Sequence, residues 1–137
     1  MSKVTGLGWS VLTVQDAGGT ARDLRDDITN LSFSTPRGVQ DTTGIGVSAH
    51  ERLLLLADFS IELDGVMDNG VNLEHDVFQT VSSTSVLRAV VIAVNGCDLS
   101  VNCYFTDYQI TRSATGELTY KAPGVLGDGN VPVWSGD

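Results

Sequence analysis

Two histidines and two cysteines are the side chains of this chain best suited to catalysis or metal binding. His75 precedes Asp76, and a hydrolase could use such a pair as a general base and its orienting carboxylate. A catalytic triad needs members that converge in space, however, and no serine lies in a Gly-x-Ser-x-Gly elbow. Adjacent helix residues also point in different directions. We therefore interpret His75-Asp76 as the polar start of a helix rather than as half of a hydrolytic site.

The other candidate ligands are too dispersed for a metal site. His50 is the second histidine, and it does not form a plausible zinc set with two distant cysteines. Cys97 and Cys103 fall on one predicted strand, about 20 Å apart at ~3.3 Å per residue. A disulfide needs a Cα separation below about 7 Å. We expect both cysteines to be buried apolar thiols in a reducing compartment.

The segment Asp64–Gly70 resembles a calcium loop only at first sight. Counted from Asp64, the third, sixth and twelfth positions of a calcium loop would be Val66, Asn69 and His75. These residues do not match the calcium-binding pattern, so a tight turn is expected. Gly6-Leu7-Gly8 lacks the rest of a dinucleotide fingerprint, and no phosphate-binding glycine loop with lysine is present. We expect no cofactor, no metal and no enzymatic activity.

Length and composition favour one folded domain over residues 1–137. Hydrophobic residues make up 42% and charged residues 18%, and no apolar run approaches the ~20 residues that span a bilayer. The N-terminus lacks a continuous apolar stretch, so we expect no signal peptide and folding in a cytoplasm. The net charge of −9 argues against a protein that binds nucleic acid by neutralising phosphates. Solubility or a surface selected not to bind DNA would each explain it.

Asn95-Gly96 separates two apolar runs between Val86 and Phe105 and is a preferred two-residue hairpin turn. The predicted register pairs Val94 with Cys97, Ile92 with Leu99, Val90 with Val101, Arg88 with Cys103, and Val86 with Phe105. All pairs except that of Arg88 are apolar and share one face. This hairpin is the strongest local structural signal in the chain.

A second strand is predicted at Ala57–Val66, with Phe59, Ile61 and Leu63 on one face and Ser60, Glu62 and Asp64 on the other. Shorter strands are expected at Ser10–Val14, Ile28–Ser34 and Leu118–Ala122, and the strand after the hairpin is expected to continue to about Arg112. A helix of about two turns is expected after an Asn72 cap, with an apolar face of Val77, Phe78 and Val81. The pattern predicts a mainly β fold, a β-sandwich or barrel with one short flanking α-helix and a long inter-strand loop.

The stretch from Gln40 to Gly65 begins as a polar, glycine-containing segment without a core-forming period. It leads directly into four consecutive leucines, Leu53–Leu56, which need burial. A long unstructured loop in a small domain is usually functional or disordered. The sequence predicts an arm that becomes ordered on a neighbouring subunit. The mixed charges of residues 22–27 fit either a solvated turn or a charge-matched contact between subunits.

The chain resembles the major tail tube proteins of long, non-contractile-tailed bacteriophages and the related tail proteins of gene transfer agents. The resemblance covers nearly the whole chain and rests on an ordered series of short segments. These are Arg22-Asp23-Leu24 through Asp27-Ile28, Phe33–Arg37, Gln40–Gly44, Glu51–Ser60, Gly65, His75–Phe78, Phe105–Tyr108, and Gly127–Gly129 to Val131–Trp134. Cys97 and Cys103 belong to no pattern of this family.

The resemblance implies a virion tail protein that assembles in the bacterial host cytoplasm into six-fold rings stacked as a tube. DNA would pass through the channel without sequence-specific binding, and a tape-measure protein and tail terminator or adaptor proteins would be partners. Residues 36–54 would form the extended assembly loop and residues 127–137 a C-terminal tail. The expected subunit interface comprises Arg37, Gln40, Asp41, Thr42, Thr43, Glu51, Arg52, Leu53, Leu54 and Leu55. The candidate channel-lining residues are Glu62 and Asp64, because an acidic wall would repel DNA.

A carbohydrate-binding or adhesion module is the alternative for a small β-sandwich. Such a module needs clustered exposed aromatic residues. The candidates in this sequence are Trp9, Tyr104, Tyr108, Tyr120 and Trp134, and no pair is spaced as a platform.

Overall fold

The computed structural model describes residues 7, 9–67, 70, 73–94 and 96–136, and this part of the chain is mainly β. The strands are β1 (Trp9–Gln15), β2 (Ala21–Asp23), β3 (Ile28–Ser34), β4 (Arg37–Asp41), β5 (Arg52–Ala57), β6 (Ser60–Val66), β7 (Arg88–Val94), β8 (Cys97–Phe105), β9 (Gln109–Arg112), β10 (Leu118–Leu126) and β11 (Trp134–Gly136). The short helix α1 spans Glu74–Phe78. The mainly β fold with a short helix that the sequence predicts is confirmed.

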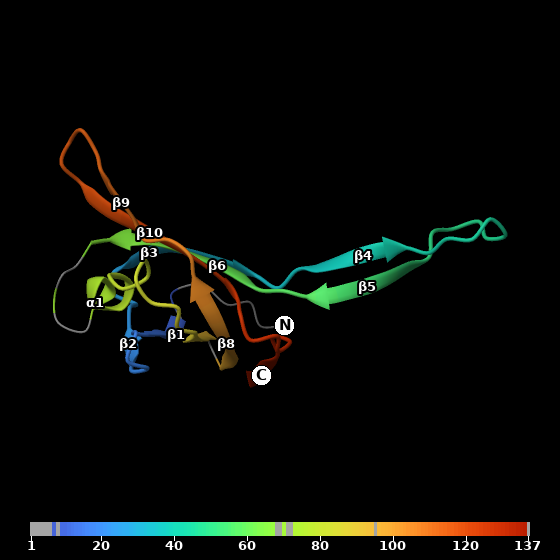
Figure 1. Cartoon of the computed structure of the whole chain (residues 1–137), viewed down its shortest axis with the longest axis horizontal. Helices are drawn as coiled ribbons and strands as arrows, with labels where there is room; N and C mark the ends of the chain where they lie inside the picture. Colours follow the sequence, from blue (N-terminus) through green and yellow to red (C-terminus); the bar gives the residue numbers. More distant parts are fainter. Residues whose placement is uncertain (1–6, 8, 68–69, 71–72, 95, 137) are drawn as a thin grey trace.

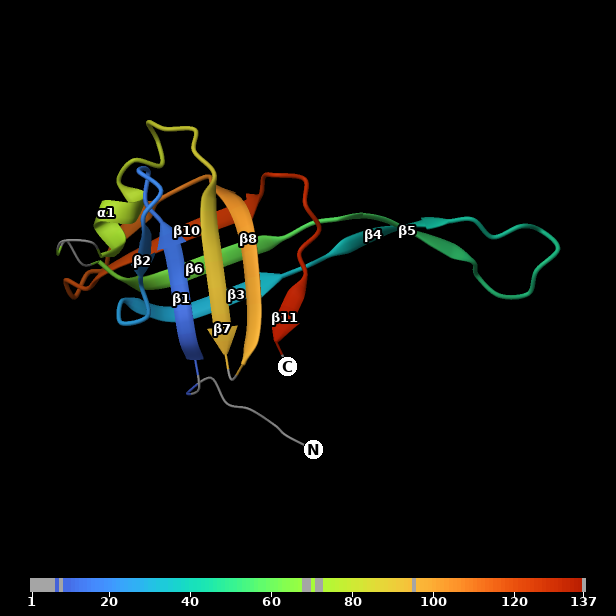
Figure 2. The same ribbon diagram turned by 90° about the horizontal axis from the view of Figure 1, so that it is seen from below.

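The body consists of two layers of antiparallel strands that cross each other (Figure 2). One layer contains β2, β1, β7 and β8, and the other contains β10, β6 and β3, in that order of pairing. The layers are continuous, because β8 pairs with β10 from Phe105↔Gly124 to Cys103↔Leu126. In addition, β9 pairs with β10 and β11 pairs with β8. Such a folded sheet buries the inner side of both layers in one core.

The core follows the alternation of the strands. On β6, Phe59 immediately before the strand, Ile61 and Leu63 are all at most 3% exposed, as the period predicts. They face buried side chains of β1, β7 and β8, and Val77 and Phe78 of α1 close one end of the same cluster. The hydrophobic contacts of this short helix hold it on the sheet, since an isolated helix of five residues would not be stable in water.

The register predicted for the hairpin is confirmed from Arg88↔Cys103 to Val94↔Cys97. Gly96 adopts φ = 87°, which suits the predicted turn, and Asn95 lies outside the described residues. The ladder stops before the expected Val86–Phe105 pair, because β7 begins at Arg88. Both cysteines are free thiols, and burial raises the pKa of Cys103 to about 12, with a further contribution from Asp128. This thiol is therefore unreactive at neutral pH.

Two predicted strand boundaries were wrong. The strand expected at Ala57–Val66 is divided, because Ala57 ends β5 and β6 begins at Ser60. The long strand expected to continue to Arg112 breaks at residues 106–108, where Tyr108 turns to pack on Phe78 and Tyr120. This break lets the chain leave β8 in one layer and pair as β9 with β10 in the other.

The two other differences concern the helix and the C-terminus. The helix is shorter than expected, with Leu73 at its N-cap and no side-chain cap; Asn72 lies outside the described residues. The expected C-terminal tail contains β11, in which Trp134 pairs with Leu99. The indole of Trp134 also lies 5.9 Å, centroid to centroid, from the ring of Phe33 on β3. The segment thus bridges the two layers instead of extending freely.

Arg88 is a buried cation that connects three elements. Its side chain is 2% exposed and donates hydrogen bonds to the carbonyl of Gln15 (3.1 Å), the carbonyl of Val77 in α1 (2.7 Å) and the hydroxyl of Thr80 (3.0 Å). Burial lowers the pKa of Arg88, and the charge of Asp16 raises it in part. Carbonyl oxygens therefore replace water around the guanidinium, which ties α1 to β1 and β7.

Arg88→Ala is expected to destabilise the protein by about 2–4 kcal/mol, because it leaves a cavity and buried acceptors without donors. Chemical denaturation measures this loss. Arg112→Ala, which truncates an exposed arginine, is the control and should change stability by less than about 0.5 kcal/mol. Equal stability of the two variants would contradict the role assigned to Arg88.

Candidate assembly surfaces

Strands β4 and β5 form a separate two-stranded ribbon that projects from the body as an arm (Figure 1). The pairs Val39↔Leu54, Gln40↔Leu53 and Asp41↔Arg52 define its register. At its base, Asp58 N–H donates to the carbonyl of Pro36 (2.9 Å). The expectation of an unstructured loop over residues 36–54 was therefore wrong: the segment is a β-ribbon, and only its far end lacks strand pairing.

The four leucines of the arm are exposed. The exposed fractions are 57% for Leu53, 60% for Leu54, 45% for Leu55 and 90% for Leu56. Successive strand residues point to opposite sides, so a run of leucines makes both faces of the ribbon apolar. Only the base of the ribbon lies beside the body, at Val131, and the predicted need of these leucines for burial is not met within the subunit.

Hydrogen bonds order the far end of the arm. The Asp41 carboxylate accepts hydrogen bonds from the N–H (2.9 Å) and hydroxyl of Thr43 and lies 3.4 Å from Nδ1 of His50. The Thr43 hydroxyl accepts from Glu51 N–H (2.9 Å), and Thr42 N–H donates to the Glu51 carbonyl (2.8 Å). Of the residues predicted at the interface, Asp41, Thr42, Thr43 and Glu51 thus form one structural unit.

The remaining predicted interface residues lie on the ribbon itself. Arg37 Nε donates to the Leu55 carbonyl (2.9 Å) near the base, while Gln40 and Arg52 belong to the paired strands. The arm therefore gathers every residue assigned to the interface, and their contact with another subunit stays a prediction. Sequence reasoning missed Ile45, which is fully exposed at the end of the arm, and Val131, which is 66% exposed beside Leu54–Ala57.

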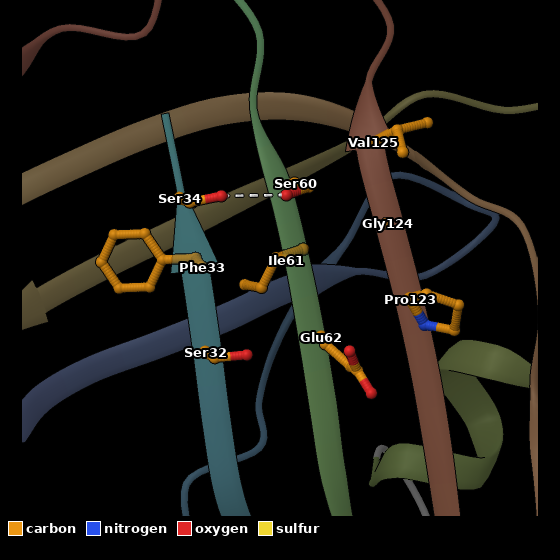
Figure 3. Close-up of a pocket in the computed structure, with 9 residues that line it drawn as sticks. All are labelled: Ser32, Phe33, Ser34, Ser60, Ile61, Glu62, Pro123, Gly124 and Val125. Atoms are coloured by element: carbon orange, nitrogen blue, oxygen red, sulfur yellow. Dashed lines mark hydrogen bonds between the residues drawn. The ribbon is translucent and has the colours of Figure 1, made fainter. Parts of the chain in front are cut away.

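The outer face of β3, β6 and β10 is a second candidate surface, and it is polar (Figure 3). Cross-strand pairs place Ser34 opposite Ser60 and Ser32 opposite Glu62, and the two serine hydroxyls of the first pair lie 3.1 Å apart. These residues line a shallow hollow with Pro123 and Val125 of β10. Small hydroxyl side chains give this face few protrusions.

Glu62 and Asp64 lie on this outer face, as the alternation of β6 predicts, but they do not make it purely acidic. Lys121 of β10 is paired with Asp64 in the register and forms an ion pair with Glu62. The pKa of Lys121 is raised, chiefly by the hydrogen bond to Glu62. The sequence alone did not predict that Lys121 lies beside Glu62 and Asp64. This proximity arises from the pairing of β10 with β6, which are more than fifty residues apart in the chain.

Both arginines of residues 22–27 form ion pairs within their own chain. Arg22 lies 3.1 Å from Asp16 and Arg25 lies 3.0 Å from Asp23. The Arg25 guanidinium also donates to the Ser10 carbonyl (2.7 Å), which anchors the turn before β3 to β1. These contacts favour the interpretation of this segment as a structured surface turn.

The residues weighed for catalysis and metal binding have structural partners. His75 Nδ1 lies 3.1 Å from the Tyr108 hydroxyl, and its ring packs on that of Tyr108. Within the described residues, no group of three or more histidine, cysteine or acidic side chains could hold a metal ion. No described helix is long and apolar enough to span a membrane.

The aromatic residues that a carbohydrate-binding module would need are dispersed over the molecule. Tyr108 and Tyr120 pack against each other and Phe78, and Trp134 lies against Phe33. Tyr104 is 41% exposed on β8. The aromatic side chains are thus divided between the core, the contact of Trp134 with β3 and the exposed side of β8, and they do not gather on one binding platform.

This fold matches two solved structures along nearly its whole length. The first is a chain in the tail of an empty gene transfer agent (GTA) particle, determined with helical refinement and C6 symmetry, with a TM-score of 0.73, 15% identity and coverage of 98% of this chain and 99% of that chain. The second is a chain in the virion of a native GTA particle, with a TM-score of 0.67, 14% identity and coverage of 98% and 99%. No protein-family model and no curated protein matches the sequence. The chain has the fold of gene transfer agent tail proteins.

The end of the arm is expected to be sensitive to acid. Hydrogen bonds from the Thr43 side chain and backbone, with a smaller contribution from His50, lower the pKa of Asp41 from 3.8. A lowered pKa means that the carboxylate stabilises the folded arm above pH 3.8, and that this stabilisation is lost as the pH falls through the folded-state value. NMR titration of the Thr43 amide should give a midpoint below 3.8. Asp41→Asn should abolish that titration, and a midpoint at or above 3.8 would contradict the geometry.

Proposed function

We propose that this protein is a structural subunit that polymerises into stacked hexameric rings and forms the tail tube of a phage or gene transfer agent particle. The observation that carries the proposal is the exposed leucine arm on a body whose fold matches GTA tail chains from end to end. Burying one leucine side chain contributes about 1.5–3 kcal/mol. An arm with four exposed leucines therefore favours association strongly, provided that a neighbour covers it.

The free edges of the sheet that contains β3, β6, β10 and β9 are an argument for lateral contacts between subunits in a ring. Among the described strands, β3 pairs only with β6 and β9 pairs only with β10, so the two outer strands have unpaired edges. Unpaired edges are a hazard in a monomer but serve as joints in an assembly. Because β3 and β9 are unlike, their pairing between subunits would be head-to-tail, which closes into a ring at a suitable rotation.

The polar outer face of this sheet would then line the channel through which DNA passes. Its serines, Glu62, Asp64 and Lys121 give a small net negative charge, which disfavours phosphate binding without a strong field. In the assembled particle we expect contacts with a tape-measure protein and with tail terminator or adaptor proteins. The virion tail is the proposed location, after assembly in the host cytoplasm, and no catalytic role is proposed.

Electron microscopy of the purified protein tests the proposal, and rings or tubes are the expected result. Leu54→Ser combined with Leu56→Ser should change the free energy of unfolding by less than about 0.5 kcal/mol, because both side chains are exposed, yet should prevent polymerisation. Leu54→Met with Leu56→Met keeps the apolar surface and is the matched control. Tubes of normal length from the serine variant would contradict a role of the arm in assembly.

The channel assignment has a separate test. Glu62→Lys combined with Asp64→Lys gathers three lysines on the outer face together with Lys121, so assembled tubes should retain duplex DNA at low salt and release it at high salt. Particles carrying this variant should assemble but deliver DNA poorly. Glu62→Gln with Asp64→Asn removes the charges without reversing them and should retain less DNA. Normal DNA delivery by the lysine variant would contradict the assignment.

A further inference from the structure

Among the described strands, the two free edges of the sheet that contains β3, β6, β10 and β9 differ in length and shape. β3 supplies seven residues to one edge, and β9 supplies four to the other. All four residues of β9 are exposed, and the hairpin of β9 with β10 projects from the body (Figure 1). A long edge and a short projecting edge are unlike surfaces, so they can join successive subunits head-to-tail.

The order of the strands determines the direction of such a pairing. Each neighbouring pair is antiparallel, from β3 through β6 and β10 to β9, so β9 runs opposite to β3 within one subunit. Rotation about the axis of a ring leaves the direction of each strand along that axis unchanged. The β9 strand of a neighbour therefore also runs antiparallel to β3, and the sheet continues around the ring with the same hydrogen-bond pattern.

The alternation of side chains limits the register to every second residue. Ile110 is paired with the buried Tyr120 and lies on the core side of the sheet. Leu31 and Phe33 of β3 also lie on the core side, where they pack against the buried cluster. Residues opposite each other in a ladder point to the same side. In a ring whose subunits all turn the same face to the channel, Ile110 must therefore face a core-side residue of β3 and not a serine of the outer face.

The tilt of the strands sets the size of the offset between subunits. Strands of closed barrels tilt by about 35–45° to the axis, which shifts the register as the sheet goes around. The four strands of one subunit, at ~4.8 Å each, span about 19 Å of the wall. A shift of four residues along them gives a tilt of about 35°, whereas a shift of two gives about 19° and a shift of six about 46°. A shift of two residues is therefore too small.

The pairing inside one subunit shows in which direction β9 must shift. Ile110 is opposite Tyr120, Tyr120 is opposite Gly65, and Gly65 is opposite Ile28. β9 thus lies level with the start of β3. A shift away from the arm would carry β9 past Ile28, where the chain forms a turn and offers no strand. The shift must be toward the arm.

The length of β3 then distinguishes a shift of four from a shift of six. Four residues along β6 lead from Gly65 to Ile61, whose partner on β3 is Phe33. With this shift every residue of β9 has a partner in β3. A shift of six would carry half of β9 beyond Ser34, where β3 ends.

We infer that β9 of one subunit pairs with the second half of β3 in the next subunit, shifted by four residues toward the arm relative to the alignment within a subunit. This inference rests on the tube proposed above and specifies its lateral contact. The pairs between subunits are Gln109 with Ser34, Ile110 with Phe33, Thr111 with Ser32, and Arg112 with Leu31.

The side chains on both sides of the sheet suit this register. Ile110 is 42% exposed in the free subunit, and the ring of Phe33 extends past β3 on the side away from β6 (Figure 3). Phe33 also contacts the half-exposed indole of Trp134, which enlarges the apolar surface that Ile110 would meet. On the outer face, Thr111 would lie beside Ser32, and this pair continues the polar surface without adding a charge.

Disulfide cross-linking of the assembled protein tests the register. The background is Cys97→Ser, because Cys97 is partly exposed whereas Cys103 is buried. Thr111→Cys with Ser32→Cys should cross-link on mild oxidation, since opposite residues of antiparallel strands have Cα atoms about 4.5–5.5 Å apart, within the disulfide limit of about 7 Å. Each subunit would be linked to both neighbours, so the products should form a ladder that ends at the closed ring.

Two further pairs report the adjacent registers. Thr111→Cys with Asn30→Cys corresponds to a shift of two, and Thr111→Cys with Ser34→Cys corresponds to a shift of six. All four positions are exposed, so the variants should fold alike, and both control pairs should cross-link less than the Ser32 pair. Stronger cross-linking of a control pair would overturn the register. Rings that cross-link through none of the three pairs would overturn the pairing of β9 with β3.

The second test measures the contribution of Ile110 to assembly. Ile110→Ser should raise the critical concentration for polymerisation about 3- to 10-fold, because the exposed part of this side chain would no longer be buried between subunits. Sedimentation measures this concentration, and thermal unfolding of the monomer checks the fold. Ile110→Leu keeps the apolar surface and should polymerise like the wild type. Equal critical concentrations for the serine and leucine variants would contradict the contact with Phe33.

The tube and the register fail in distinguishable ways. Wild-type protein that forms neither rings nor tubes contradicts the proposed function and the register with it. Rings whose cross-links follow a control pair contradict only the register. Rings that cross-link between Thr111→Cys and Ser32→Cys support both.

Discussion

Four consecutive leucines lie on a ribbon that projects away from the core of the subunit, so they cannot be buried there. The remaining structure must keep this ribbon folded although its apolar side chains are exposed. A two-stranded ribbon is at best marginally stable in water when it stands alone. Here its strands continue from β3 and β6 of the body, and hydrogen bonds among Asp41, Thr43 and Glu51 order its far end. The ribbon is thus kept in shape without burying its apolar side chains, which remain available to a partner.

The body supplies what the arm lacks, a core that is complete within one subunit. Buried residues from both layers meet in this core. Arg88 and Trp134 attach two peripheral elements, α1 and β11, to the rest of the body. Arg88 holds α1 through carbonyl oxygens, and Trp134 holds β11 against β3. A subunit with its own core can expose its arm and sheet edges without unfolding. Folding therefore does not depend on association with a partner.

The parts of the fold that could be predicted from sequence are those specified by local patterns. The turn at Asn95-Gly96 and the alternation around it define the register from Arg88 to Cys103, and the alternation of β6 places Glu62 on the outer face. The leucine run could not predict a ribbon, because identical residues carry no period. The break at residues 106–108 and the ion pair of Lys121 with Glu62 depend on contacts between distant strands, which local patterns do not encode. For residues 36–54 the β structure was missed, and the contact of this segment with another subunit stays a prediction.

The arm is a direct prolongation of β3 and β6, and this continuity has a mechanical consequence. A pull along the arm acts parallel to two strands that are hydrogen-bonded to each other along Ile28–Ser34 and Ser60–Val66. Backbone hydrogen bonds loaded in this direction share the force as a group, whereas bonds loaded across the strands would break one after another. Tension between successive subunits would therefore be carried by the sheet as a whole. An assembly joined through such arms could bend or stretch while the load stays distributed through the β-structure of each subunit.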